Sequence, residues 1–156
     1  MSTSTVLRAC RVVNPTQRGM MATMGYHVTV ERRDDGFVGR NDRGAEIAFG
    51  TGGDSPLFSP IELLLVALGG CNIVTVEPLT AKRGHRLLRL AATMEAEKTA
   101  PNRLSTITVT YDVELPPNDP DAARIFSEVA HRVHERSCTV STSLIEPTAI
   151  DVRLPV

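Results

Sequence analysis

The stretch that decides the fold is Ser59-Pro60-Ile61-Glu62-Leu63-Leu64-Leu65-Val66-Ala67-Leu68-Gly69-Gly70-Cys71. Serine is a favoured helix N-cap, and proline at the first helical position loses no donor that the helix needs. Glu62, three residues after Ser59, completes a capping-box pattern and suits the helix dipole. The residues after Glu62 are apolar on nearly every side, so we predict a central, buried helix that carries Cys71.

The same helix contains residues that weaken or interrupt it. Gly69 and Gly70 each cost about 1 kcal/mol relative to alanine, a cost typical of sites where another helix or a substrate approaches closely. Pro78 removes an N–H donor and crowds the carbonyl of Val74. We therefore predict a kink or restart at Pro78, with a second helical segment that ends near Gly84.

A second cysteine lies in Glu135-Arg136-Ser137-Cys138-Thr139-Val140. We predict that a helix capped by Asp119, with Pro120 at its first position, leads up to Cys138. Its apolar stripe consists of Ile125, Phe126, Val129 and Val133. Cys71 and Cys138 are separated by 138 − 71 = 67 residues, which excludes a CxxC redox motif. Only the fold can bring the two thiols together.

Alternating apolar and polar residues predict strands on either side of the first helix. Residues 26–31, 37–38 and 45–49 form a short antiparallel meander, and residues 86–98 and 104–115 form a longer pair. One face of the last segment is apolar, at Ile107, Val109, Tyr111, Val113 and Leu115. We predict a closing strand over residues 149–154. Strands that precede and follow helices in this way indicate an α+β fold with antiparallel sheets.

Length and composition favour one globular domain without a nucleic-acid or membrane partner. The 156 residues carry a formal net charge of −1, and the longest apolar run, Leu63 to Leu68, is too short to span a bilayer. We interpret residues 1–24 as a flexible arm, with Cys10 an incidental thiol, and residues 25–156 as the domain. Three cysteines and no signal-peptide pattern favour the reducing cytoplasm, where a disulfide is catalytic rather than structural.

Cysteine chemistry depends on ionisation, because only the thiolate is a nucleophile. Burial in an apolar helix raises a thiol pKa, so a functional Cys71 needs a nearby guanidinium, and Arg40 and Arg43 are the best candidates. A sulfenic acid on Cys71 would need Cys138 close by to escape over-oxidation. The alternative is that Cys71 is a small core residue and that Cys138 packs at a helix end.

Histidines offer a competing but weaker signal. His131, His134 and Cys138 share one helical face, but they span roughly 10 Å, too far for one ion without a bend. His27 and His85 show no partner pattern. We expect solvated helix histidines, no metal and no cofactor.

The two cysteine motifs, their order and the strands between them resemble the OsmC/Ohr family of thiol-dependent hydroperoxide reductases. The similarity covers residues 26–154, and Gly39-Arg40-Asn41-Asp42-Arg43-Gly44 is similar to the arginine loop of that family. The resemblance implies an OsmC-like fold. In this fold, antiparallel sheets wrap around two central helices in an intertwined homodimer, and the active sites lie at the subunit boundary.

The resemblance also implies roles for the site residues. Cys71 would attack an organic hydroperoxide, Cys138 would resolve the product, and Arg40 or Arg43 would keep Cys71 ionised. In the well-characterised branch a glutamate follows the proline that opens the cysteine helix. Here Ile61 occupies that position, and Glu62 lies about 100° around the helix. The chain is therefore more similar to the less characterised OsmC-like branch.

These observations predict a thiol-dependent peroxidase that reduces organic hydroperoxides through a Cys71 sulfenic acid resolved by Cys138. A dithiol would reduce the enzyme again. The alternatives are a non-catalytic dimer that binds a small hydrophobic ligand, and a redox sensor that signals through the Cys71–Cys138 disulfide.

Overall fold

The computed structural model describes residues 25–146 and 148–155, so the predicted arm and Cys10 lie outside the described residues. In chain order the elements are β1 (Val28–Arg33), β2 (Gly36–Asn41), β3 (Glu46–Phe49), α1 (Pro60–Lys82), β4 (Arg89–Ala100), β5 (Arg103–Glu114), α2 (Ala122–Arg132), the π-helical turn η1 (Val133–Ser137) and α3 (Thr139–Ile145). This order of strands and helices confirms the α+β class.

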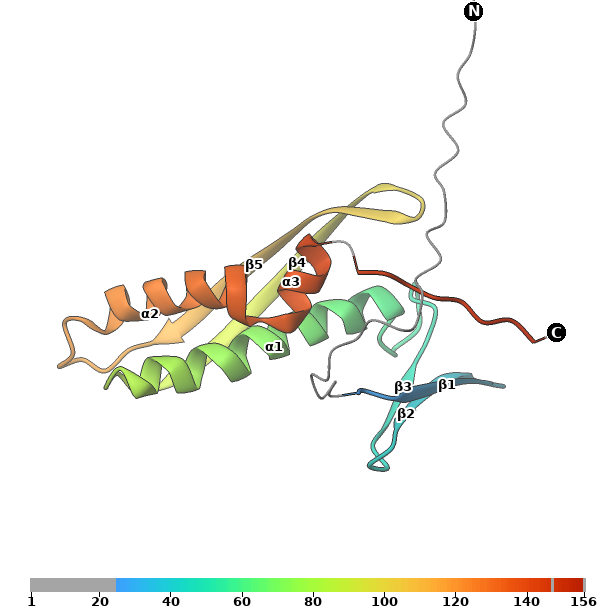
Figure 1. The fold of residues 1–156 in the computed structure, drawn as a ribbon, viewed down its shortest axis with the longest axis horizontal. Helices are drawn as coiled ribbons and strands as arrows, with labels where there is room; N and C mark the ends of the chain where they lie inside the picture. The colour runs from blue at the N-terminus through green and yellow to red at the C-terminus, as the bar shows by residue number, and fades with distance from the viewer. Residues whose placement is uncertain (1–24, 147, 156) are drawn as a thin grey trace, which may run out of the picture.

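The elements form two groups in space. β1, β2 and β3 make an antiparallel sheet in that order, and β4 and β5 make a long antiparallel hairpin. α1 packs against β4 and α2, so two helices lie side by side along the hairpin (Figure 1). β1, β2 and β3 pack mainly on one another, and their sheet lies beyond the end of the α1 layer where that helix begins (Figure 1).

α1 begins and ends where the sequence predicts, but as one helix rather than two segments. Ser59 accepts from the Glu62 backbone N–H, and the Glu62 carboxylate accepts from the Ser59 N–H at 2.6 Å. The predicted restart at Pro78 is wrong, because α1 continues without a break to Lys82. The Val74 carbonyl, which loses its donor there, belongs to a residue that is 69% exposed, where water can replace the missing partner.

By length and composition, α1 could also cross a bilayer, which the shorter run Leu63 to Leu68 could not. A core helix of a globular protein passes the same test. Here one side of α1 packs on β4 and α2 and buries Asn72, but only 28% of the apolar window of the helix is buried, so the predicted burial on nearly every side is not reached within one chain.

The core lies between α1, the hairpin and α2. Its buried members are Leu68, Val76, Ile125, Phe126, Val129, Ala130, Val133 and Cys138. The predicted α2 stripe is therefore confirmed. The predicted face of β5 is confirmed as well, since its apolar residues pack against this cluster.

Three predicted boundaries are wrong. α2 begins at Ala122, so Asp119 does not cap it. The Asp119 carboxylate instead accepts a hydrogen bond from the His85 imidazole, with 2.6 Å between Oδ2 and Nδ1. β4 begins at Arg89 rather than at residue 86, and it extends to Ala100. No closing strand forms in residues 148–155, where Ile150, Val152 and Leu154 are exposed. An alternating segment becomes a strand only where a sheet edge is free to pair with it.

Candidate active site

Two thiols from distant parts of the chain meet beneath the α1–α2 layer. Cys71 lies midway along α1 and is partly buried, while Cys138 follows η1 and is fully buried. The two side chains lie close enough for each to shift the pKa of the other, and both are free thiols. The fold therefore supplies the proximity that the sequence spacing leaves open.

A π-helical turn places Cys138. The Cys138 N–H donates to the Val133 carbonyl at 2.9 Å, which closes the wide turn, and the backbone then becomes extended at Cys138. α3 starts at the next residue, and the Cys138 sulfur caps it by accepting the Ser141 N–H at 3.4 Å. Single π-helical turns inside α-helical segments are frequent at functional sites. Here the turn directs the thiol into the core rather than along the surface of α2.

Sequence reasoning missed a polar side chain that faces the pair. Asn72 is fully buried, and its amide nitrogen lies 2.8 Å from the Leu68 carbonyl, 3.7 Å from the Cys138 sulfur and 3.4 Å from the Ser141 hydroxyl. Its amide oxygen accepts from the Tyr111 hydroxyl at 3.1 Å. The signal in the sequence was an asparagine directly after Cys71 in an otherwise apolar helix. Such a residue requires hydrogen-bond partners when it is buried.

The environment moves the two thiol pKa values in opposite directions. Burial, followed by the hydrogen bond to Cys138, raises the pKa of Cys71. Burial acts to raise the pKa of Cys138 too, but hydrogen bonds from Cys71, Ser141 and the Val140 N–H outweigh it and lower that pKa. Of the two thiols, Cys138 is therefore the one whose thiolate the single chain favours.

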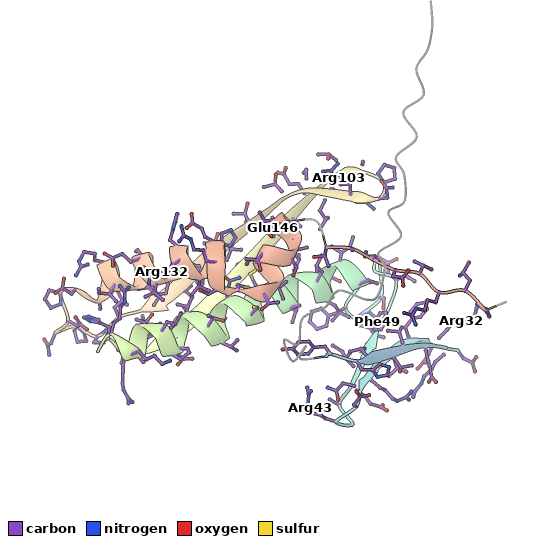
Figure 2. The ribbon with its side chains drawn as sticks, viewed as in Figure 1. Arg32, Arg43, Phe49, Arg103, Arg132 and Glu146 are labelled. Atoms are coloured by element: carbon purple, nitrogen blue, oxygen red, sulfur yellow. The ribbon has the colours of Figure 1, made fainter. Side chains whose placement is uncertain are left out.

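The predicted arginines lie elsewhere in the chain. Arg40 on β2 binds Glu46, and it binds Glu31 at 2.7 Å. Arg43 lies in the turn between β2 and β3, at the far tip of the N-terminal sheet (Figure 2). Within one described chain, neither arginine is brought to Cys71. Glu62 belongs to the α1 cap.

The histidines have partners that the sequence did not indicate. His27 lies 2.7 Å from Asp42, and His85 lies 2.6 Å from Asp119, contacts for which the sequence shows no pattern. His131 lies 3.5 Å from Glu135 on the surface of α2, while Cys138 points into the core.

A cavity of about 310 Å³ lies near the cysteine pair, but neither cysteine lines it. It opens between α1, the start of β5, η1 and α3, and its wall includes Ser141, which contacts the Cys138 sulfur. The lining is mostly apolar: Leu68, Leu104, Ile107, Leu144 and Ile145, with Ser105, Thr106, His134 and Ser141 as its polar members. A small apolar molecule could therefore occupy the cavity, with Ser141 between it and the Cys138 sulfur.

The fold and the site define a class of α+β proteins with two cysteines on central helices. The model of the OsmC-like protein family matches residues 52–153, and the chain belongs to that family. An uncharacterized protein of Mycobacterium tuberculosis is 26% identical over 119 residues, which cover 76% of this chain and 87% of that protein.

Solved structures show the same fold at lower identity. The OsmC-like protein of Mycoplasma pneumoniae is 18% identical with a TM-score of 0.66, covering 81% of this chain and 91% of that one. An organic hydroperoxide resistance protein OsmC of Legionella pneumophila is 14% identical with a TM-score of 0.57, covering 80% and 91%. At these identities the likeness establishes the fold alone.

Proposed function

We propose that this protein is a thiol-dependent peroxidase that reduces organic hydroperoxides. The observation that carries the proposal is that two free thiols, Cys71 and Cys138, come together in the fold, with a largely apolar cavity on the far side of Ser141. Two neighbouring thiols are the arrangement that a reversible disulfide requires. The chain belongs to the OsmC-like family, and a structure of the same fold is named an organic hydroperoxide resistance protein. Both support the same reaction.

Cys71 is the thiol that meets the peroxide in this proposal, because it is the more exposed of the two. As Cys71 attacks the outer peroxide oxygen, its proton passes along the hydrogen bond to Cys138. The O–O bond breaks, Cys71 becomes a sulfenic acid, and the alkoxide leaves as the alcohol after taking the proton from Cys138.

The Cys138 thiolate then resolves the sulfenic acid. It attacks the Cys71 sulfur, the S–S bond forms, and hydroxide departs. One hydroperoxide is reduced to an alcohol and hydroxide while two sulfurs lose two electrons. A dithiol reductant in a reducing cytoplasm would restore both thiols by exchange.

We further propose that the working form is a homodimer. Val66, Gly70 and Val74 follow one another at four-residue intervals on α1, and all three are exposed in the single chain. A helix that is apolar all round is ordinarily buried all round, so a second copy is the partner that fits this stripe. Arg40 or Arg43 could then reach Cys71 only from the partner, as the arginine loop of the family implies.

The cavity supports one alternative function. Its largely apolar lining would suit a small hydrophobic ligand whether or not the thiols react. A protein that served only to bind would retain such a ligand in native mass spectrometry and would keep both thiols reduced in the presence of a hydroperoxide.

The experiment is peroxide consumption by single-cysteine variants. Cys71→Ser should abolish consumption of cumene hydroperoxide. Cys138→Ser should permit one turnover that leaves a sulfenic acid on Cys71, which dimedone traps. Cys10→Ser is the matched control and should behave as the parent does. Unchanged turnover in Cys71→Ser would refute the proposal.

A further inference from the structure

Asn72, the residue after Cys71 on α1, lies in the core beside the Cys138 sulfur. One of its amide hydrogens is directed at the Leu68 carbonyl, 2.8 Å away. The other faces the Cys138 sulfur at 3.7 Å and the Ser141 hydroxyl at 3.4 Å. These are hydrogen-bond distances, the first of them ordinary for a sulfur acceptor.

The orientation of the amide is determined by its neighbours. If the amide were flipped, its oxygen would face the Leu68 carbonyl oxygen, which can only accept. In the observed orientation the amide oxygen accepts from the Tyr111 hydroxyl at 3.1 Å. Tyr111 itself is held by β5 and by an edge-to-face contact with Phe126, whose ring centroid lies 5.6 Å away. The hydrogen bonds to the Leu68 carbonyl and from the Tyr111 hydroxyl therefore fix the direction of the N–H that faces Cys138.

We propose that Asn72 is a positioning residue for the cysteine pair: its amide N–H holds and stabilises the Cys138 thiolate against Cys71, and Tyr111 holds the amide. This inference rests on the proposed function, in which Cys138 must be ionised to resolve the Cys71 sulfenic acid. Within one chain, this neutral N–H donor would stabilise the thiolate, as a charged guanidinium does more strongly.

Few other groups act on the Cys138 sulfur. The titratable side chains that face it in the described chain are Cys71 from α1 and Tyr111 from β5. α3 contributes the Ser141 N–H and hydroxyl and the Val140 N–H. Removal of the Asn72 amide therefore leaves the N–H donors of α3 in place, and the effect of the amide can be measured separately.

The test measures the thiolate of Cys138 directly. In a Cys10→Ser, Cys71→Ser background, Cys138 is the single thiol of the chain, and serine at position 71 retains a hydroxyl donor. Thiolate absorbance in the ultraviolet is then followed against pH. We expect Asn72→Leu to raise the midpoint of this titration by about one unit, which is a tenfold loss of thiolate.

Two further variants keep the test decisive. Thr80→Val is the matched control, because Thr80 is a fully buried polar residue of α1 whose hydroxyl donates to the Val76 carbonyl and not to sulfur. It should leave the midpoint unchanged. Tyr111→Phe removes only the hydroxyl that anchors the amide, and it should raise the midpoint by less than Asn72→Leu does.

The outcomes separate this inference from the proposed function, because the titration uses no peroxide. An unchanged midpoint in folded Asn72→Leu overturns the positioning role, even if the parent consumes peroxide. If Asn72→Leu does not fold, an unchanged midpoint in Tyr111→Phe overturns it. If Asn72→Leu raises the midpoint while the parent protein consumes no peroxide, the positioning role is supported and the peroxidase proposal is refuted.

Discussion

Single residues at the start of α1 have a structural role that is separable from chemistry. Ser59 and Glu62 satisfy each other's backbone N–H groups, which the first turn of a helix would otherwise leave without partners. The hydrogen bonds from Ser59 also lower the pKa of the Glu62 carboxyl. The resemblance to the OsmC/Ohr family implies an active-site role for an acidic residue near this position. Glu62 here caps the start of α1.

Substitution of Glu62 tests this assignment. Glu62→Ala should lower stability at neutral pH and leave peroxide consumption per folded molecule unchanged. Because the folded-state pKa of Glu62 is depressed, its contribution is present above the ordinary glutamate pKa and is lost as the pH falls through the folded value.

The measurement is thermal denaturation of Glu62→Ala at neutral and acid pH beside an activity assay. Ser59→Ala is the companion variant and should cost about 1 kcal/mol. Loss of activity in Glu62→Ala without loss of stability would contradict a purely structural role.

At the scale of elements, α1 and β4 approach each other at a glycine. A Cβ at Gly69 would collide with the methyl group of Met94 and lie 3.0 Å from its sulfur, whereas a Cβ at Gly70 would meet nothing within 4 Å. Gly69 thus permits the close contact of helix and hairpin on which the core is built. The helix-propensity cost that the sequence indicates at this residue is offset by packing.

A double-mutant cycle measures this contact. Gly69→Ala should destabilise the parent by no more than about 1 kcal/mol, because the flexible end of the Met94 side chain can move aside and alanine favours the helix. In a Met94→Ala background the same substitution should be less harmful, since the Met94 side chain is gone and alanine favours the helix by about 1 kcal/mol. Chemical denaturation of the four proteins gives the coupling. Additive effects would show that Gly69 does not face Met94.

Sequence patterns anticipated these elements where the cause was local. The α1 cap, the α2 stripe and the apolar face of β5 follow from residues near one another in the chain. The contacts of Asn72 with Tyr111 and of His85 with Asp119 could not be anticipated, because they join residues that are distant in sequence. Whether Pro78 interrupts α1 also could not be predicted, because that depends on whether water can reach the Val74 carbonyl that lacks a donor.

At the scale of the whole molecule, much apolar surface has no partner within one chain. Besides the stripe on α1, Val28 and Val30 on β1 are exposed, and so are Ile150, Val152 and Leu154 near the end of the chain. The last segment has the alternation of a strand but pairs with no sheet edge in the described chain. These surfaces are the places where a second copy of the chain would pack.

The stripe on α1 provides the test of assembly. Val74→Asp should convert the proposed dimer to a monomer, because it would bury an unpaired carboxylate in the interface. Ala123→Asp on the exposed side of α2 is the control and should leave the dimer intact. Light scattering after size exclusion gives the mass of each. A parent protein of monomer mass would contradict the dimer.

The central claim is that Cys71 and Cys138 form a redox pair, and intact mass spectrometry with thiol counting tests it most directly. One equivalent of cumene hydroperoxide should remove two hydrogen atoms and two thiols from the protein. Peptide mapping should then join Cys71 to Cys138, and hydrogen peroxide serves as the comparison oxidant. If both thiols remain free while the hydroperoxide persists, the account is contradicted.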